Sequence, residues 1–401
     1  MEKIKWKVNT MPRTSDSKLD LMNLTEVKKA RAFHESFPQY SITPLTSLCQ
    51  MAKRLGLKEV YVKDESYRFG LNAFKVLGGS YAMACYIAKQ TGRDVSELPY
   101  NVLTSDALRE EFGQATFFTA TDGNHGRGVA WAANKLRQRS VILMPKGTTQ
   151  RRLKNILDEG AEATIEEYNY DECVRRANAM AENTEHGVMV QDTAWDGYEE
   201  IPTWIMQGYG TMAMEADDQL HDAGCERPTH VFIQAGVGSL AGAVQGYFAN
   251  RYPDAPPKVI VVEAEAAACL YKSAVTDDGS IQIVDGDMQT IMAGLACGEP
   301  NTISFDILKN HVDTFLACPD WVSSLGMRML AAPLKGDAPV TSGESGAAPF
   351  GALVSIMEME EYKDLREHLG LDENSRVLLF STEGNTDPER YESIVWHGKE
   401  C

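Results

Sequence analysis

Between about Ala115 and Asp192 the sequence alternates between short apolar runs and longer amphipathic stretches, and this alternation restricts the possible folds more than any other feature. Short apolar runs are typical of buried strands, and amphipathic stretches are typical of helices. The expected strands are ATFFTAT, SVILMP, AEATIEE and GVMVQD, and the expected helices are GRGVAWAANKLRQ, TQRRLKNILDEG and YDECVRRANAMAENTEHG. Because strands joined by one helix each run parallel, we predict a small α/β domain over residues 96–192.

The same alternation continues outside this segment. The expected strands there are EVYVKDES, THVFIQ, KVIVVEAEA and RVLLFSTEG, and the expected helices include IPTWIMQGYGTMAMEADDQL and SLAGAVQGYFANRY. A chain of 401 residues is also too long for one compact core. We therefore predict a larger sheet domain, formed by residues 1–95 and 193–401, into which the small domain is inserted.

Charge and hydropathy exclude several classes of partner. The formal net charge of -18 disfavours binding to nucleic acids and to anionic membranes. The sequence has no apolar run long enough to span a membrane, and its first residues lack the apolar stretch of a signal peptide, so we expect a cytoplasmic protein. The eight cysteines form no Cys-x-x-Cys pattern, and no metal site is predicted. Whether Cys269 and Cys297 pair is left open.

Four turns follow the ends of expected strands, where open parallel sheets bind their ligands. They are KDESYRFGLNAFK, TATDGNHGRG, QAGVGSLAG and STEGNTD. In the first, Lys75 shares a helix face with Gly78, Gly79 and Ala82, so a flat ligand or a neighbouring backbone can approach closely. A lysine in a dry pocket loses its proton readily and forms Schiff bases, although a solvated lysine is the simpler alternative.

The turn QAGVGSLAG has the composition of a phosphate-binding loop. Successive backbone N–H groups at a helix start bind anions, and here they belong to Gly236, Val237, Gly238 and Ser239. A nicotinamide dinucleotide site is a rival interpretation, because Glu263 ends the next expected strand at the position of a ribose-binding acid. Its glycine spacing is G-x-G-x-x-x-G rather than G-x-G-x-x-G. Close helix packing without a ligand is a third interpretation.

The other two turns are ordinary when each is considered singly. Asp122 and Asn124 are residues that cap helices, His125 is a residue often held by structural hydrogen bonds, and Thr382 lies in a sequence typical of a turn. None of them alone indicates catalysis. Only their occurrence together with Lys75 and the glycine-rich loop indicates a function.

Together, the four turns resemble those of the β-family, or fold type II, of pyridoxal-phosphate enzymes, from YSITPLTSL through STEGNTD. The resemblance implies an α/β fold of two domains, a large doubly wound sheet domain and a smaller inserted α/β domain, with pyridoxal 5'-phosphate between them. It also implies a homodimer that acts on a small amino acid. The segment AFK corresponds to the Schiff-base lysine, and TDGNHG corresponds to the loop SSGNHG of the family.

The resemblance also assigns roles to individual residues. Lys75 forms the Schiff base, Asn124 bonds the phenolic oxygen of the cofactor, and the Thr382 hydroxyl faces the pyridine nitrogen. An alcohol at that position leaves the nitrogen largely unprotonated, which favours elimination. Glu344 falls where relatives hold an acid near the ring, and its role is left open. The phosphate is assigned to Gly236, Val237, Gly238 and Ser239, and the substrate carboxylate to Thr121, Asp122, Gly123 and His125.

Two acids depart from the pattern of the family. Asp122 replaces the serine of serine and threonine dehydratases, and Asp192 ends the last strand of the small domain. Two carboxylates suit a substrate with a second ammonium group, which leaves as ammonia only when protonated. The chain thus resembles the members that eliminate ammonia from D- and L-2,3-diaminopropionate, giving pyruvate and two ammonia. We expect Lys75 to be the base for the L isomer and Asp122 for the D isomer.

Asp192 is expected to hold the β-ammonium group, with helix capping as its alternative role. Four alternatives to the expected reaction stay open. A serine or threonine dehydratase, or a β-replacement enzyme of the same family, would prefer a different substrate. A dinucleotide-dependent dehydrogenase would show no borohydride-sensitive visible absorbance, and a catalytically silent cofactor-binding protein would show that absorbance without turnover.

Overall fold

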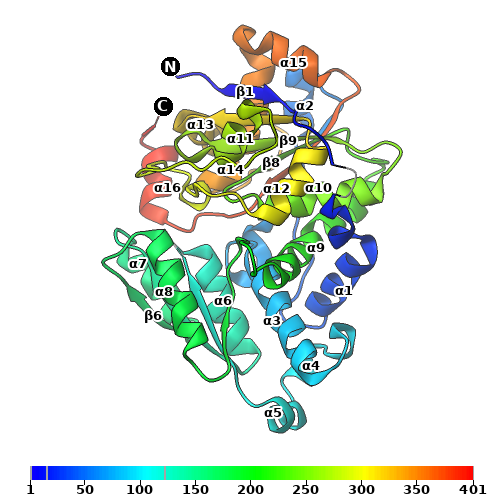
Figure 1. The fold of residues 1–401 in the computed structure, drawn as a ribbon. Coiled ribbons are helices and arrows are strands. Elements are labelled where there is room, and N and C mark those ends of the chain that lie inside the picture. The colour runs from blue at the N-terminus through cyan, green and yellow to red at the C-terminus, as the bar shows by residue number, and fades with distance from the viewer. Residues whose placement is uncertain (1, 15–16, 122, 401) are drawn as a thin grey trace. The chain divides into compact units, whose positions relative to one another are not determined.

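The computed structural model describes residues 2–14, 17–121 and 123–400. The chain packs into two compact units (Figure 1). The larger unit consists of Met1–Leu24, Ile42–Ala73 and Met212–Cys401, and the smaller unit consists of Thr25–Ser41 and Phe74–Thr211. Each unit has its own sheet and its own hydrophobic core.

The sheet of the larger unit has seven strands among the described residues, in the order β1-β10-β9-β8-β11-β3-β2. The central strands run parallel, whereas β1 and β2 pair antiparallel at the two edges. In this order the strands are Lys5–Val8, Thr314–Cys318, Lys258–Ala264, His230–Gln234, Arg376–Ser381, Glu59–Asp64 and Leu45–Ser47. The predicted strands of this sheet are confirmed, and β1, β2 and β10 are added to them.

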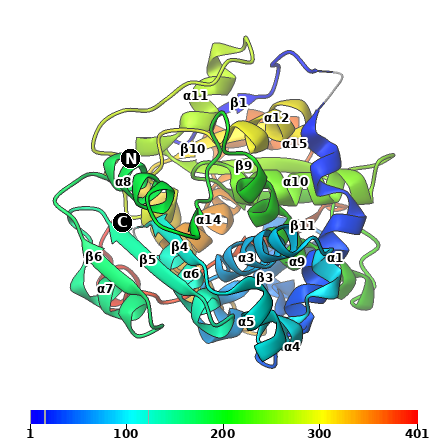
Figure 2. The ribbon, with the colours of Figure 1, turned by 60° about the horizontal axis from the view of Figure 1, so that its bottom comes forward.

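Helices cover the sheet of the larger unit, and α10 and α12 contact each other (Figure 2). The α-helices are α2 (Cys49–Leu55), α10 (Ser239–Arg251), α11 (Cys269–Thr276), α12 (Thr302–His311), α13 (Asp320–Ala331), α14 (Glu344–Glu358), α15 (Lys363–Leu369) and α16 (Pro388–Val395). The short 3-10 helices are Lys18–Met22, Glu65–Gly70, Glu265–Ala267, Ala293–Leu295 and Glu360–Tyr362. Helix α9 (Glu200–Asp222) begins in the smaller unit and ends in the larger one.

The sheet of the smaller unit is wholly parallel among the described residues, with the order β6-β5-β4-β7. Its strands in this order are Glu162–Ile165, Arg139–Met144, Thr116–Ala120 and Gly187–Met189. The other helices are α1 (Leu24–Glu35), α3 (Val76–Thr91), α4 (Tyr100–Leu103), α5 (Asp106–Phe112), α6 (Asn124–Lys135), α7 (Gln150–Leu157), α8 (Tyr170–Glu182) and the 3-10 helix Val95–Glu97. The predicted alternation of parallel strands and helices is therefore confirmed.

The two compact units divide the chain at other positions than the expected domain bounds of 95/96 and 192/193, because α3, the first part of α9 and Thr25–Ser41 belong to the smaller unit. Helices α3 and α6 lie against each other. A Cβ atom added to Gly128 of α6 would come within 2.8 Å of the backbone nitrogen of Val76, so the glycine permits this close approach. The sequence pattern shows that α3 is a helix, but it does not show which neighbour the helix packs against.

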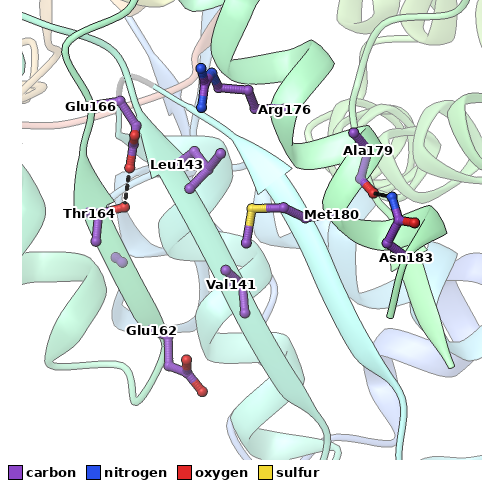
Figure 3. Close-up of a pocket in the computed structure, with 10 residues that line it drawn as sticks. Val141, Leu143, Glu162, Thr164, Glu166, Arg176, Ala179, Met180 and Asn183 are labelled. Atoms are coloured by element: carbon purple, nitrogen blue, oxygen red, sulfur yellow. Dashed lines mark hydrogen bonds between the residues drawn. The ribbon is translucent and has the colours of Figure 1, made fainter. Parts of the chain in front are cut away.

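An open groove in the smaller unit lies between β5, β6 and α8 (Figure 3). The residues that line it are Val141, Leu143, Glu162, Ala163, Thr164, Glu166, Arg176, Ala179, Met180 and Asn183. Thr164 Oγ1 donates a hydrogen bond of 2.6 Å to Glu166 Oε1 at its wall. None of the residues expected to bind cofactor or substrate lines this groove, so it is separate from the candidate site.

Within residues 2–14, 17–121 and 123–400, none of the helices is both long enough and apolar enough to cross a bilayer.

Candidate active site

Lys75 immediately precedes α3 in the smaller unit, and its side chain is 23% exposed. Its Nζ donates a hydrogen bond to Oδ2 of Asp192. The small residues that follow it serve protein packing: a Cβ atom added to Gly78 would lie 2.7 Å from the ring of Tyr209 in α9. The glycine face of α3 therefore accommodates a neighbouring helix, and the lysine amine projects to a buried carboxylate.

Asp192 follows β7 and is almost fully buried. Burial alone would raise the pKa of its carboxyl group, but the positive charges of Lys75 and His125 outweigh burial and lower the pKa to about 2. The Tyr209 hydroxyl also donates a hydrogen bond of 3.5 Å to Oδ2. Because α9 begins only at Glu200, this carboxylate does not cap that helix. Of the two expected roles, capping of α9 is therefore not supported, and a contact with a β-ammonium group stays a prediction; the contact that the structure shows is the one with Lys75.

His125 lies beside Asp192 in the first turn of α6. Its Nδ1 is 3.9 Å from Oδ2 of Asp192, and its Nε2 is 2.9 Å from the carbonyl oxygen of Val190. A carbonyl oxygen only accepts hydrogen bonds, so Nε2 carries a proton. This contact orients the ring and directs Nδ1 toward Asp192.

The loop before α6 is held by Thr121, which is buried. Its Oγ1 accepts hydrogen bonds from the backbone N–H groups of Gly123 at 2.9 Å and Gly126 at 3.1 Å. The N–H of Gly123, for which the resemblance predicts a contact with a substrate carboxylate, is therefore bound to Thr121. The Thr121 hydroxyl retains its own proton for donation. Asp122 lies outside the described residues.

The loop expected to bind a phosphate lies in the larger unit. It joins β8 to α10, and the N-cap residue of this helix is Gly238, which has no side chain with which to cap it. Gly238 has a φ of +100°, and a Cβ atom there would lie 2.9 Å from Ser304 Oγ. At Gly236, a Cβ atom would lie 3.2 Å from the carbonyl oxygen of Gly294. A helix start that follows two glycines fits an anion such as a phosphate group.

Thr382 follows β11 and contacts a residue that the sequence interpretation missed. Gln234, the last residue of β8, donates a hydrogen bond of 2.6 Å from Nε2 to Thr382 Oγ1. Glu344 begins α14, and its Oε1 lies 3.3 Å from Nε of Arg390. Gln234 ends a predicted strand next to the glycine loop, and this position is the only signal in the sequence that could have identified it.

Glu263 is the acid on which the dinucleotide interpretation depends. It is fully buried and accepts hydrogen bonds from the backbone N–H groups of Leu270 at 2.8 Å and Tyr271 at 2.6 Å. Burial raises its pKa to about 8. Both oxygens of the carboxyl group therefore accept hydrogen bonds from the backbone at the start of α11, and the group is buried where a ribose cannot reach it. This geometry does not support a dehydrogenase.

The two cysteines whose pairing was left open lie next to the glycine loop. The thiol of Cys269 lies 3.5 Å from the carbonyl oxygen of Cys297 and 3.8 Å from that of Gly236. Burial raises the pKa of the Cys269 thiol. This thiol is therefore held as a neutral donor toward backbone carbonyl groups.

Replacing Asp192 by asparagine removes a carboxylate whose folded pKa is about 2. A carboxylate with a depressed folded pKa stabilises a protein above its unfolded pKa, and the contribution is lost as the pH falls through the folded value. We expect cofactor-free wild type to exceed Asp192→Asn by roughly 2 kcal/mol in unfolding free energy at pH 7, and the difference to shrink between about pH 4 and pH 2. Urea unfolding across this range measures it. A difference independent of pH would contradict an ionised Asp192.

Comparisons with known proteins agree on one family. The profile described as pyridoxal-phosphate dependent enzyme matches residues 37–383. Diaminopropionate ammonia-lyase of Salmonella typhimurium is 50% identical over 401 residues, which cover 99% of each chain. The Escherichia coli K12 enzyme of the same name is 47% identical over 380 residues, 94% of this chain and 93% of that one.

Solved structures show the same relationship. The holo structure of diaminopropionate ammonia lyase from Escherichia coli has a TM-score of 0.91 and 44% identity, over 100% of this chain and 98% of that chain. Threonine deaminase isoform 2 of Solanum lycopersicum, at 21% identity, has a TM-score of 0.71 over 98% of this chain and 97% of that chain, and shows the fold alone. The chain therefore belongs to the family of pyridoxal-phosphate-dependent enzymes and has the two-domain α/β fold of type II.

Proposed function

We propose that this protein is a diaminopropionate ammonia-lyase that converts D- and L-2,3-diaminopropionate to pyruvate and two ammonia. The observation that carries the proposal is the contact between Lys75 and the buried, ionised Asp192. A fixed negative charge beside the lysine suits a substrate with a second ammonium group. The extended identity to relatives of that name supports the same substrate.

The residues present fit pyridoxal phosphate, and the proposal assigns its contacts. The Lys75 amine binds the aldehyde carbon, Asn124 bonds the phenolic oxygen, and the Thr382 hydroxyl bonds the pyridine nitrogen. The N–H groups of residues 236–239 bind the phosphate. When bound, the cofactor accepts the electron pair that is released at the substrate Cα.

The smaller unit supplies the groups that move protons. Lys75 Nζ accepts the α-proton of the L isomer, and Asp122 accepts that of the D isomer. The loop Thr121–His125 binds the substrate carboxylate, with the free proton of the Thr121 hydroxyl as one donor. In this proposal the two bases lie on opposite faces of the substrate Cα, and each removes the proton of one isomer.

Asp192 holds the β-ammonium group in its protonated form until the Cβ–N bond breaks. The bond's electron pair leaves with the nitrogen, so a nitrogen that already carries three protons departs as neutral ammonia. Water then hydrolyses the enamine product to pyruvate and a second ammonia. A serine hydroxyl at the same place would leave Asp192 facing an uncharged group, and a buried carboxylate that loses its cation is disfavoured. The proposal therefore favours a diamino acid over serine or threonine.

The stoichiometry of the products tests the proposed reaction. We expect the purified holoenzyme to release two ammonia per pyruvate from L-2,3-diaminopropionate, as measured by coupled assays for both products. A β-replacement enzyme supplied with a thiol would instead form a new amino acid and little pyruvate. Ammonia release without pyruvate would overturn the proposed elimination.

Asp122→Asn is expected to separate the two isomers. Removing a general base costs about 10²–10⁴-fold in rate, so turnover of D-2,3-diaminopropionate should fall by that factor. Turnover of the L isomer should fall far less, because Lys75 accepts its proton. The kcat for each isomer, measured with the same enzyme preparation, provides its own control. Equal losses for both isomers would contradict the division between the two bases.

The assembly and location of the protein are part of the proposal. The family resemblance favours a homodimer in the cytoplasm that acts on a small amino acid. Sedimentation velocity of the holoenzyme measures the assembly directly, and a monomer at micromolar concentration would contradict the homodimer.

A further inference from the structure

Gln234 forms a buried hydrogen-bond pair with Thr382 in the larger unit. Its side-chain Nε2 lies 2.6 Å from Thr382 Oγ1 and 3.0 Å from the carbonyl oxygen of Phe380. Gln234 is 1% exposed and Thr382 is 3% exposed, so water does not compete for these bonds. The parallel pairing of β8 with β11 brings the two strand ends together.

The Phe380 carbonyl determines which way the amide of Gln234 points. A carbonyl oxygen only accepts hydrogen bonds, so the amide atom that faces it must be the nitrogen. The reversed amide would place two acceptors against each other at a buried site. The same nitrogen therefore supplies its second proton to Thr382 Oγ1. Oε1 of Gln234 is buried and has no hydrogen-bond partner in the part of the chain that the structure describes.

The direction of the bond to Thr382 determines what its hydroxyl can do. A hydroxyl has one proton and two acceptor positions. Because Thr382 accepts from Gln234, its own proton stays available for a different acceptor. An unprotonated pyridine nitrogen is such an acceptor, whereas a pyridinium N–H would need an acceptor in return.

We propose that Gln234 is a positioning residue that fixes the Thr382 hydroxyl as a hydrogen-bond donor to the pyridine nitrogen of pyridoxal phosphate. The inference rests on the role assigned to Thr382 in the proposed function. The fixed direction of the Thr382 hydroxyl gives a physical cause for an unprotonated nitrogen, because a donor directed at the nitrogen opposes its protonation. A neutral pyridine is a weaker electron acceptor than a pyridinium, which favours rapid loss of a leaving group from Cβ over a long-lived carbanion.

The carboxylates near this turn have other contacts. Glu383 Oε1 accepts a hydrogen bond of 3.0 Å from the backbone N–H of Ser345. Glu344 Oε1 lies 3.3 Å from Nε of Arg390. Neither of these two interactions involves Thr382 or Gln234.

The substitution Gln234→Glu tests this directly. A carboxylate only accepts hydrogen bonds, so Thr382 must donate to it and turn a lone pair toward the cofactor. We expect the ¹⁵N resonance of holoenzyme loaded with ring-¹⁵N pyridoxal phosphate to move from the position of a neutral pyridine toward that of a pyridinium. The matched control is Gln245→Glu, because Gln245 is also 1% exposed and its Oε1 also has no hydrogen-bond partner among the described residues. This control should leave the resonance unchanged.

A second substitution covers the case in which a buried acid prevents folding. Gln234→Met removes both N–H donors and keeps the length of the side chain. The Thr382 hydroxyl is then free to rotate, and we expect the ¹⁵N resonance to move in the opposite direction, toward a pyridine that accepts no hydrogen bond. A resonance unchanged in both Gln234 variants would overturn the role of Gln234.

Thr382→Val distinguishes failure of this inference from failure of the assigned site. If Thr382→Val shifts the ¹⁵N resonance while the Gln234 variants do not, Thr382 faces the nitrogen and only the role of Gln234 is wrong. If Thr382→Val has no effect, the assignment of Thr382 itself is wrong. A wild-type resonance already at the pyridinium position would also overturn the inference.

Discussion

Lys75→Ala is expected to lower the rate of pyruvate formation by at least about 10⁴-fold, because the variant lacks both the amine that binds the cofactor and the base for the L isomer. The visible absorbance of lysine-bound cofactor should disappear, and borohydride should no longer attach the cofactor to the protein. Lys75→Arg should be equally inactive, since a guanidinium keeps its proton and does not replace an amine nucleophile.

The control for this substitution lies on α3, the helix that Lys75 precedes. Lys89 of α3 forms an exposed salt bridge of 2.7 Å with Glu200, and Lys89→Ala removes a lysine without touching the candidate site. Its activity and absorbance should match those of wild type. If Lys75→Ala retained borohydride-stable cofactor, another lysine would have to be the attachment site.

Glu215→Gln is expected to destabilise the larger unit by about 3–5 kcal/mol, because it leaves buried cations with too little negative charge. Oε2 of Glu215 lies 2.7 Å from Nζ of Lys63 and 2.7 Å from a guanidinium nitrogen of Arg68. Arg68 also pairs with Glu65 at 2.8 Å, and these side chains are at most 1% exposed. Two cations thus balance two carboxylates away from water.

The pH dependence of this stabilisation follows from the pKa of Glu215. Burial alone would raise that pKa, but the charges of Arg68 and Lys63 outweigh it and lower the pKa to about 2. The contribution is therefore complete above the unfolded pKa of about 4.3 and is lost as the pH falls toward 2. Urea unfolding of wild type and Glu215→Gln at pH 7 and near pH 3 measures both effects.

An exposed salt bridge provides the comparison for Glu215. Glu358 lies 2.6 Å from Nε of Arg54, and both side chains are exposed. Glu358→Gln should leave the urea midpoint unchanged within error, since exposed ion pairs contribute little. A Glu215→Gln variant as stable as Glu358→Gln would show that the buried cluster does not need its full charge balance.

The parts of the fold that could be predicted are those whose pattern is local. Strands such as β4 and β8 are buried on both faces, so they appear as apolar runs between amphipathic helices. β1 and β2 have mostly exposed or half-buried residues and span only Lys5–Val8 and Leu45–Ser47, so their sequences carry no comparable signal. Their formation depends on pairing with strands distant in the chain.

Within the candidate site, the chemistry that a single residue could perform was easier to predict than the contacts that the residues make with one another. Lys75 and Asp192 were identified by residue type and position, and the structure brings them together from 117 residues apart. Tyr209 and Gln234 were missed, because a tyrosine in an apolar helix and a glutamine at a strand end have no distinctive pattern. Their roles arise only from the packing of α9 against α3 and the pairing of β8 with β11.

The central claim is that Asp192, which contacts Lys75, selects a substrate with a second ammonium group. The most direct measurement is pyruvate release by the purified holoenzyme from L- and D-2,3-diaminopropionate and from L-serine under the same conditions. The account predicts fast release from both diaminopropionate isomers and slow release from serine. Faster release from serine would contradict it, and would leave Asp192 as a structural partner of Lys75 in a dehydratase.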